Sequence, residues 1–340
     1  MKKLSEMNWL AGLAAVLVAV SPLVGNAQTR MPMPADPPAA VEPASEKGRL
    51  PYGGVNDERS IKVDPNVNFN LCVVQGNLRI NGWKRDEIRI FIRDGSRVNF
   101  RVKEKDPKTE TPVWVAAIGY DPKKVNKAFP DCLWGEEIEI DLPHGATVAV
   151  TGQETRASAD SVKKVTIKNA GGDISVRNIS YGVSATTYRG DITLANSRGP
   201  IGLESTTGNI VVFEAGPSGH GDPFKAKTNS GAITLQQVEH RQIEAGSISG
   251  SILFIGKLLG GGTYAFTTSN GSIRLALPAD ASSRITASYG FGSFASDIPI
   301  RERREEPIGP IKTLTGLLGK GDLALLRLVT NSGMITIRPQ

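Results

Sequence analysis

The sequence predicts an all-β protein whose short strands stack as a β-solenoid. Three observations support this class. Glycine is abundant, with 37 of 340 residues or about 11%, against a usual share of roughly 7%. From Val55 onward, short alternations of apolar and polar residues are broken by Gly, Asn, Asp and Ser, which is typical of strands. A glycine-centred motif also recurs eight times. Helical periodicity is almost absent, and only residues 311–318 are predicted to form a short helical turn.

The amino terminus predicts a signal peptide over residues 1–27. Lys2 and Lys3 precede a short apolar stretch, and Gly25 and Ala27 supply small residues for cleavage before Gln28. The apolar stretch is too short to span a membrane comfortably, although an uncleaved anchor is the alternative interpretation. Residues 28–54 are rich in proline and predict an extended linker. No second long apolar run follows, so we expect no transmembrane span in the mature chain and a periplasmic or extracellular location.

Residues 55–160 predict an N-terminal β region that continues into a solenoid over 161–340. The region contains Cys72 and Cys132, the two cysteines of the chain. Export and the even count favour a disulfide between them, which would close a loop of about 60 residues and stabilise the fold by roughly 3–4 kcal/mol. Two buried free thiols are the alternative.

An internal repeat is the most informative feature. The pattern Gly-x-Ile-x-aliphatic (or Phe) begins at Gly172, Gly190, Gly199, Gly208, Gly231, Gly250, Gly271 and Gly333. Three residues before these glycines stand Asn169, Thr187, Asn196, Ser205, Thr228, Ser247, Thr268 and Thr330. Every one of these residues is Asn, Ser or Thr.

The spacing of the motif predicts the size of one coil. Successive glycines lie 18, 9, 9, 23, 19, 21 and 62 residues apart, so one coil has about 18–21 residues and carries the motif once or twice. Glycine permits a tight turn, the polar side chain satisfies backbone groups there, and the apolar residues point inward at period 2. A single coil cannot bury its own apolar strip, so coils stack. An antiparallel sandwich with similar hairpin turns is the alternative.

A resemblance agrees with this interpretation. The run from Gly271 to Ala281, the segment Ile285–Ser288 and the closing run Leu328–Ile337 resemble a bacterial "putative adhesin" family of β-strand repeats with unknown function. The residues around Leu71–Trp83 and Ile138–Val150 resemble the opening and middle strands of that family. The resemblance covers about residues 55–340 and implies a β-helix-like domain in the cell envelope.

No catalytic, cofactor-binding or metal-binding constellation emerges from the sequence. Asp173 and Asp191 are 18 residues apart and would stack about 4.8 Å apart, where they either hold a cation or act as solvated turn acids; we expect the latter. His144, His220 and His240 share no metal-ligand spacing. The formal charge of +6, with 40 Lys and Arg against 34 Asp and Glu, is spread thinly and excludes a concentrated nucleic-acid surface.

The sequence therefore predicts an exported, non-catalytic protein that binds or scaffolds an envelope protein or glycan. A β-helix enzyme acting on polysaccharide, as a lyase or hydrolase, is the alternative, and a purely structural envelope protein is a third. Binding residues concentrate on irregular segments of rigid scaffolds. We therefore expect the residues that contact a binding partner to lie in segment 216–224 and in the charged stretch 301–321, because both look like excursions from the repeat.

Overall fold

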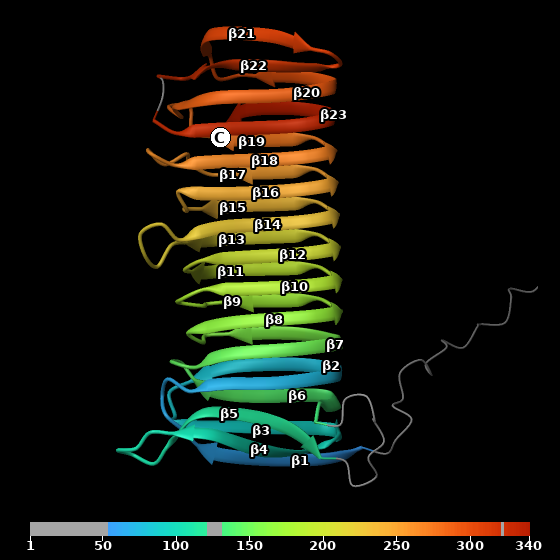
Figure 1. Ribbon diagram of the computed structural model, residues 1–340, viewed down its shortest axis with the longest axis vertical. Helices are drawn as coiled ribbons and strands as arrows, with labels where there is room; N and C mark the ends of the chain where they lie inside the picture. Colours follow the sequence, from blue (N-terminus) through green and yellow to red (C-terminus); the bar gives the residue numbers. More distant parts are fainter. Residues whose placement is uncertain (1–53, 121–130, 321–322) are drawn as a thin grey trace, which may run out of the picture. The chain divides into compact units, whose positions relative to one another are not determined.

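The computed structural model describes residues 54–120, 131–320 and 323–340. Every regular element in these ranges is a strand. The 23 strands join into one hydrogen-bonded sheet that coils into a stack (Figure 1). The predicted signal peptide (residues 1–27) and, except for Gly54, the predicted linker (28–54) lie outside the described residues. Within them, no helix long and apolar enough to cross a membrane is present.

The middle of the chain forms two parallel ladders. Face A consists of β8 (Lys164–Gly171), β10 (Val183–Arg189), β12 (Ile201–Thr207), β14 (Pro223–Ser230), β16 (Gln242–Ser249) and β18 (Thr263–Asn270). Face B consists of β9 (Ile174–Arg177), β11 (Ile192–Arg198), β13 (Ile210–Gly216), β15 (Ile233–Val238), β17 (Ile252–Ile255) and β19 (Ile273–Leu277). Within each face, every strand pairs in parallel with the next strand of that face, so one coil contains one strand of each face.

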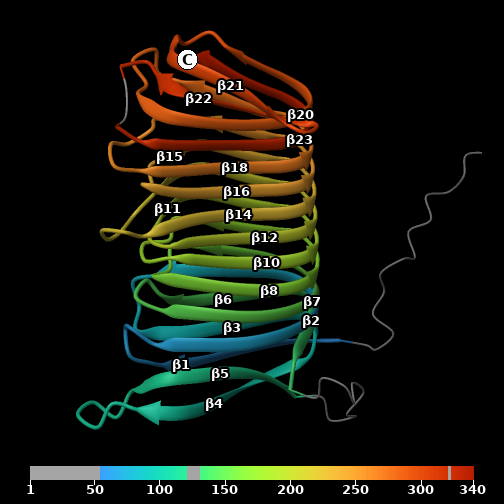
Figure 2. The same ribbon diagram turned by 45° about the horizontal axis from the view of Figure 1, so that its top comes forward.

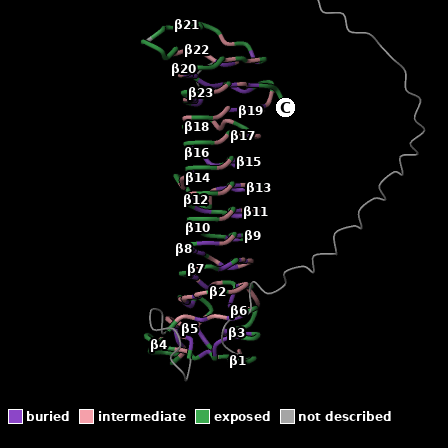
Figure 3. Tube along the Cα trace, turned by 90° about the vertical axis from the view of Figure 1, so that its right-hand side faces the viewer, coloured by how far each residue is buried: buried purple, intermediate pink, exposed green. Residues whose placement is uncertain are grey.

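The space between the faces is filled by columns of apolar side chains, as the repeat predicts. The motif isoleucines are all at most 2% exposed: Ile174, Ile192, Ile201, Ile210, Ile233, Ile252, Ile273 and Ile335. Buried and outward residues alternate along the strands (Figure 3), because successive side chains of a strand point to opposite sides. The solenoid register inferred from the sequence is therefore confirmed.

A tight turn, here called the glycine bend, joins each face A strand to the next face B strand. The hydroxyl three residues before the glycine donates to the carbonyl of the glycine one coil earlier, as in Ser205 Oγ to Gly190 O at 2.9 Å and Thr228 Oγ1 to Gly208 O at 3.0 Å. Thr187, Ser247, Thr268 and Thr330 make the same bond. The coils are thus tied by side chains as well as by the strand ladders.

One motif glycine lies elsewhere. Gly199 is on the opposite edge, here called the loop side, where each face B strand returns to face A. Asn196, three residues earlier, is exposed with a φ of 42° and donates to Asn178 Oδ1 at 2.8 Å instead of to a glycine carbonyl. The motif therefore marks both edges of the coil at this point, which explains the two nine-residue steps in the sequence.

The N-terminal end closes the stack with longer and partly antiparallel strands: β1 (Val55–Lys62), β2 (Asn68–Trp83), β3 (Glu87–Gly95), β4 (Arg97–Lys105), β5 (Pro112–Tyr120), β6 (Leu133–Pro143) and β7 (Thr147–Asp160). β7 bends across both faces, pairing first with β8 and then with β9. β2 lies between β7 on one side and β5 and β6 on the other. The antiparallel strands β3, β1 and β4 complete this end.

The predicted disulfide is present. Cys72 lies on β2, Cys132 directly precedes β6, and their Cα atoms are 4.6 Å apart. The bond closes a loop with a sequence separation of 60 and fastens β2 to the segment that enters the neighbouring strand. In the chain-entropy description, a loop of this size contributes roughly 4 kcal/mol to the free energy of unfolding.

The C-terminal end contains β20 (Ser283–Ser296), β21 (Ile300–Ile308), β22 (Ile311–Leu318) and β23 (Leu325–Pro339) (Figure 2). β23 pairs with β18 and β19 on one edge and with β20 on the other. The expectation of an irregular excursion over 301–321 is wrong, as is that of a helical turn over 311–318, because β21 and β22 form an antiparallel hairpin on β20. The charges of 301–306 belong to an edge strand, where they prevent further pairing.

We expect Gly208→Ala to destabilise the fold. Gly208 has a φ of 155°, and an added Cβ would lie 2.0 Å from the carbonyl oxygen of Gly190. This contact is too close, so the backbone must shift or remain strained, which lowers the free energy of unfolding by roughly 1–3 kcal/mol. Gly202→Ala is the matched control, because nothing lies within 4 Å of its added Cβ, and it should be neutral or slightly stabilising. Urea unfolding measures both variants, and equal effects would contradict the proposed packing at the bend.

We expect Leu314→Asp to detach the β21–β22 hairpin. Leu314 is fully buried, so an aspartate there places a charge in the core at a cost of about 3 kcal/mol or more. Loss of the hairpin uncovers the edge of β20, which should promote self-association. Thermal melting with light scattering tests this, with Thr315→Asp at the exposed neighbouring position as control. A monomeric, equally stable Leu314→Asp protein would show that the hairpin is dispensable.

Candidate functional site

The segment 216–224, predicted as a contact element, is partly structural. β13 ends at Gly216, β14 begins at Pro223, and Phe224 is fully buried, which leaves 217–222 as the loop. Asp222 holds this loop in shape by accepting the N–H groups of Gly219 at 2.8 Å and Ser218 at 2.9 Å. These bonds, the one from Gly219 foremost, lower the pKa of Asp222. The loop borders a hollow of about 320 Å³ next to Glu239 and Arg241.

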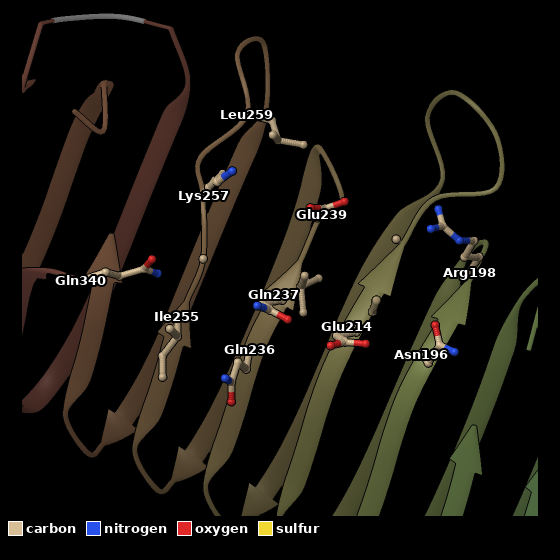
Figure 4. A pocket seen from close by; sticks show the side chains of 14 residues that line it. Asn196, Arg198, Glu214, Gln236, Gln237, Glu239, Ile255, Lys257, Leu259 and Gln340 are labelled. Atoms are coloured by element: carbon tan, nitrogen blue, oxygen red, sulfur yellow. The ribbon is translucent and has the colours of Figure 1, made fainter. Parts of the chain in front are cut away.

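A groove of about 420 Å³ crosses face B beside the loop side. Its outer wall consists of polar and charged side chains from successive strands, together with the residue that follows β23 (Figure 4). The groove-lining residues are Asn196, Arg198, Glu214, Ala215, Gly216, Gln236, Gln237, Val238, Glu239, Ile255, Gly256, Lys257, Leu259 and Gln340. Glu239 and Leu259 also line the hollow under the 217–222 loop, so the two depressions adjoin.

A column of backbone kinks at residues with positive φ, here called bulges, creates the polar wall of this groove. Asn196, Glu214 and Gln237 have φ values of 42°, 53° and 54°, and the strand pairing skips them: Ala195 pairs with Phe213, and Ser197 with Ala215. This kink turns two successive side chains outward in each coil before the next one points back into the core. Each coil therefore contributes one additional polar side chain to the surface.

The charges in the groove balance. Arg198 and Lys257 carry positive charge, Glu214 and Glu239 carry negative charge, and all four are exposed. Among the described residues, the side chains of these four residues and of Gln236 and Gln237 make no hydrogen bond or ion pair. These six side chains are therefore free to bind a ligand, whereas the lining residues Asn196 and Gln340 already donate to Asn178 Oδ1 and to the carbonyl oxygen of Ala276.

His240 is a buried residue that contacts the loop side from the core. It is fully buried, its Nε2 lies 2.9 Å from the carbonyl oxygen of Gly199, and its ring is 5.6 Å from that of Phe224. Nδ1 has no partner among the described residues. Burial lowers the pKa of His240, so the imidazole is neutral and donates from Nε2 to Gly199.

Asp173, Asp191 and His144 make contacts within the fold. Asp173 and Asp191 accept backbone N–H groups of the next coil, from Asp191 at 3.0 Å and Asn209 at 2.7 Å. His144 Nδ1 lies 2.8 Å from the carbonyl oxygen of Ser161, and His220 is exposed in the 217–222 loop. In residues 54–120, 131–320 and 323–340, no three potential metal-ligating side chains gather.

Sequence reasoning missed the groove, although a signal for it exists. Four residues after the motif isoleucines Ile174, Ile192, Ile210 and Ile233 stand Asn178, Asn196, Glu214 and Gln237. All four have positive φ. Asn adopts this conformation readily, whereas Glu and Gln do so less often. A polar residue recurring at this position predicts an outward bulge in the coil.

The chain is similar to one known protein family and to several solved structures. The sequence profile of the Toastrack DUF4097 family matches residues 135–338, more than half of the chain. No curated protein matches the chain. Among solved structures, similar chains come from Clostridium sporogenes, named "putative cell adhesion protein" (12% identity, TM-score 0.25), and from Bacteroides fragilis and Parabacteroides merdae, both named "putative adhesin" (11% identity each, TM-scores 0.34 and 0.35). Each similarity covers 84% of this chain and respectively 100%, 97% and 99% of the other.

We expect stability to fall on mild acidification because of His240. Burial lowers its pKa in the folded protein, so below its ordinary pKa of 6.5 the unfolded chain binds the proton more readily than the folded chain does. The free energy of unfolding therefore decreases as the pH falls from about 7 to 5. Urea unfolding across this range measures the effect. His240→Gln retains a donor for Gly199 and should show a flatter profile; an unchanged slope would rule out His240 as its source.

Proposed function

The chain belongs to the Toastrack DUF4097 family, and from this premise we propose that it is an exported, non-catalytic protein that binds or scaffolds other components of the cell envelope. Its location in this proposal is the periplasm or the cell surface. The disulfide between Cys72 and Cys132 supports an oxidising compartment, where such bonds persist.

The observation that carries the proposal is the arrangement of free polar side chains. Groups able to do acid–base chemistry elsewhere, such as Asp173, Asp191 and His240, are engaged in hydrogen bonds that join coils. The unpaired groups of the groove instead form a row that crosses successive coils. A row of this kind suits an extended partner better than a small substrate, as is general for the surfaces of stacked repeats.

An enzyme acting on polysaccharide is the second candidate, and the presence of Glu214 and Glu239 in one groove favours it. Glycoside hydrolases use two carboxyl groups in different protonation states. One of them is usually held protonated by an apolar environment. Both carboxylates here are exposed, so burial gives neither of them that role, and binding is the better supported function.

We expect the 217–222 loop to contribute to binding without contributing to folding. In the test, this loop is replaced by a Gly-Ser linker in the protein comprising residues 28–340, and thermal melting is measured beside capture of envelope components from a cell extract. The replacement should leave cooperative melting intact and reduce capture. Replacing the exposed turn 106–111 between β4 and β5 is the matched control and should leave capture unchanged.

Three results would contradict this proposal. Equal capture by the loop variant and the wild-type protein would exclude a contact at the loop. Retention of the protein in the cytosol after cell fractionation would exclude export. Release of reducing sugar or unsaturated product from envelope polysaccharide by the purified protein would show catalysis.

A further inference from the structure

The groove on face B is elongated along the stacking direction. Its lining side chains come from β11, β13, β15 and β17, with Gln340 beyond them (Figure 4). Neighbouring strands lie about 4.8 Å apart, so these four strands span about 14 Å, roughly the length of three sugar rings. A ligand that contacts the whole groove must therefore be extended and must lie across the strands.

The polar groups of the groove fit an uncharged ligand that both donates and accepts hydrogen bonds. The carboxylates of Glu214 and Glu239 would repel a polyanion, while Arg198 and Lys257 would repel a polycation. The amides of Gln236 and Gln237 offer donors and acceptors side by side, and a hydroxyl group can serve as both. The hydroxyl groups of a neutral ligand can donate to the carboxylates and accept from the cations, so each of these side chains can gain a hydrogen bond.

Apolar surface accompanies these polar groups. Ile255 and Leu259 are half-buried groove residues, and Phe213, the neighbour of Glu214 on β13, is 41% exposed. A pyranose ring presents hydroxyl groups at its edge and C–H groups on its faces, so it matches a polar wall next to apolar side chains. Ligand sites commonly combine apolar contact with a few placed polar groups.

An extended peptide fits this groove less well. Peptides in extended conformation usually bind by adding a strand to an open sheet edge. The strands β11, β13, β15 and β17 are each paired on both sides. Their backbone groups are used within the sheet, so a peptide main chain finds no ladder to join there.

The bulges that present the groove side chains also carry strain. A non-glycine residue in the left-handed region is disfavoured by roughly 1–2 kcal/mol, and Glu214 and Gln237 both adopt it. Glycine would adopt the same backbone without this cost. Strained positions of this kind cluster at ligand sites.

We propose that the face B groove binds a neutral glycan strand lying across β11, β13, β15 and β17. The proposal deepens the binding function proposed above and rests on it. Asn196, Glu214, Gln236 and Gln237 would bond the sugar hydroxyl groups, while Ile255 and Leu259 would contact the C–H faces of the rings.

The test is titration calorimetry with cellohexaose, maltohexaose and chitohexaose, using hexagalacturonate as an anionic probe and unstructured decapeptides as peptide probes. At least one neutral hexasaccharide should bind, and its affinity should rise steeply from the monosaccharide to the trisaccharide and little beyond. The double variant Glu214→Gly with Gln237→Gly should melt at the same or a higher temperature, yet bind that glycan at least tenfold more weakly. Asn229→Ala, at an exposed position on face A, is the control and should bind as the wild-type protein does.

Three outcomes would overturn the proposal: no binding of any neutral hexasaccharide, binding of only the anionic or peptide probes, or glycan binding that the double variant leaves unchanged. The broader function is tested separately by capture of envelope components. Capture of envelope components without glycan binding would support the general binding function and would contradict the proposal that this groove binds a glycan.

Discussion

The stack depends on the close approach of backbones at the glycine bend. From Gly190 onward, each bend places its glycine directly against the carbonyl oxygen of the glycine one coil earlier, at a distance that leaves no room for a Cβ atom. The same carbonyl accepts a buried hydroxyl from the next coil. Steric fit and hydrogen bonding at this edge thus fix the spacing and phase of the coils, which in turn align the isoleucine columns of the core.

This constraint leaves the opposite edge free to vary. The loop side contains the two-residue connection after β11, the 217–222 loop after β13 and the longer segment between β17 and β18. The bulges on face B lie next to this edge, and the groove follows them. One edge of the stack is regular because the glycine bend recurs from coil to coil. The other edge is irregular because its connections differ in length, and it is there that side chains are displayed.

Much of the central fold follows from local pattern, since the spacing of the motif and the alternation of apolar residues predict coil length and core positions. The structure of the two ends of the stack cannot be predicted from local pattern. β2 and β23 are inserted between strands that are distant in sequence, and no local signal encodes such pairings. The charges of residues 301–306 resemble a solvated loop, yet an edge strand needs the same charges to prevent association. The groove was missed because it depends on the positive φ angles of Asn196, Glu214 and Gln237, and the alternation of apolar residues does not predict these angles.

The insertion of β23 determines how the molecule resists force. A pull on the chain at Gln340 along β23 acts on its parallel ladders with β18 and β19 on one edge and with β20 on the other. Because the load runs along the strand, these hydrogen bonds must shear together, whereas a peripheral hairpin would unzip bond by bond. Rupture under tension is governed by the rate of unfolding, which such a clamp slows. The terminal strand is thus fastened as firmly as a central strand.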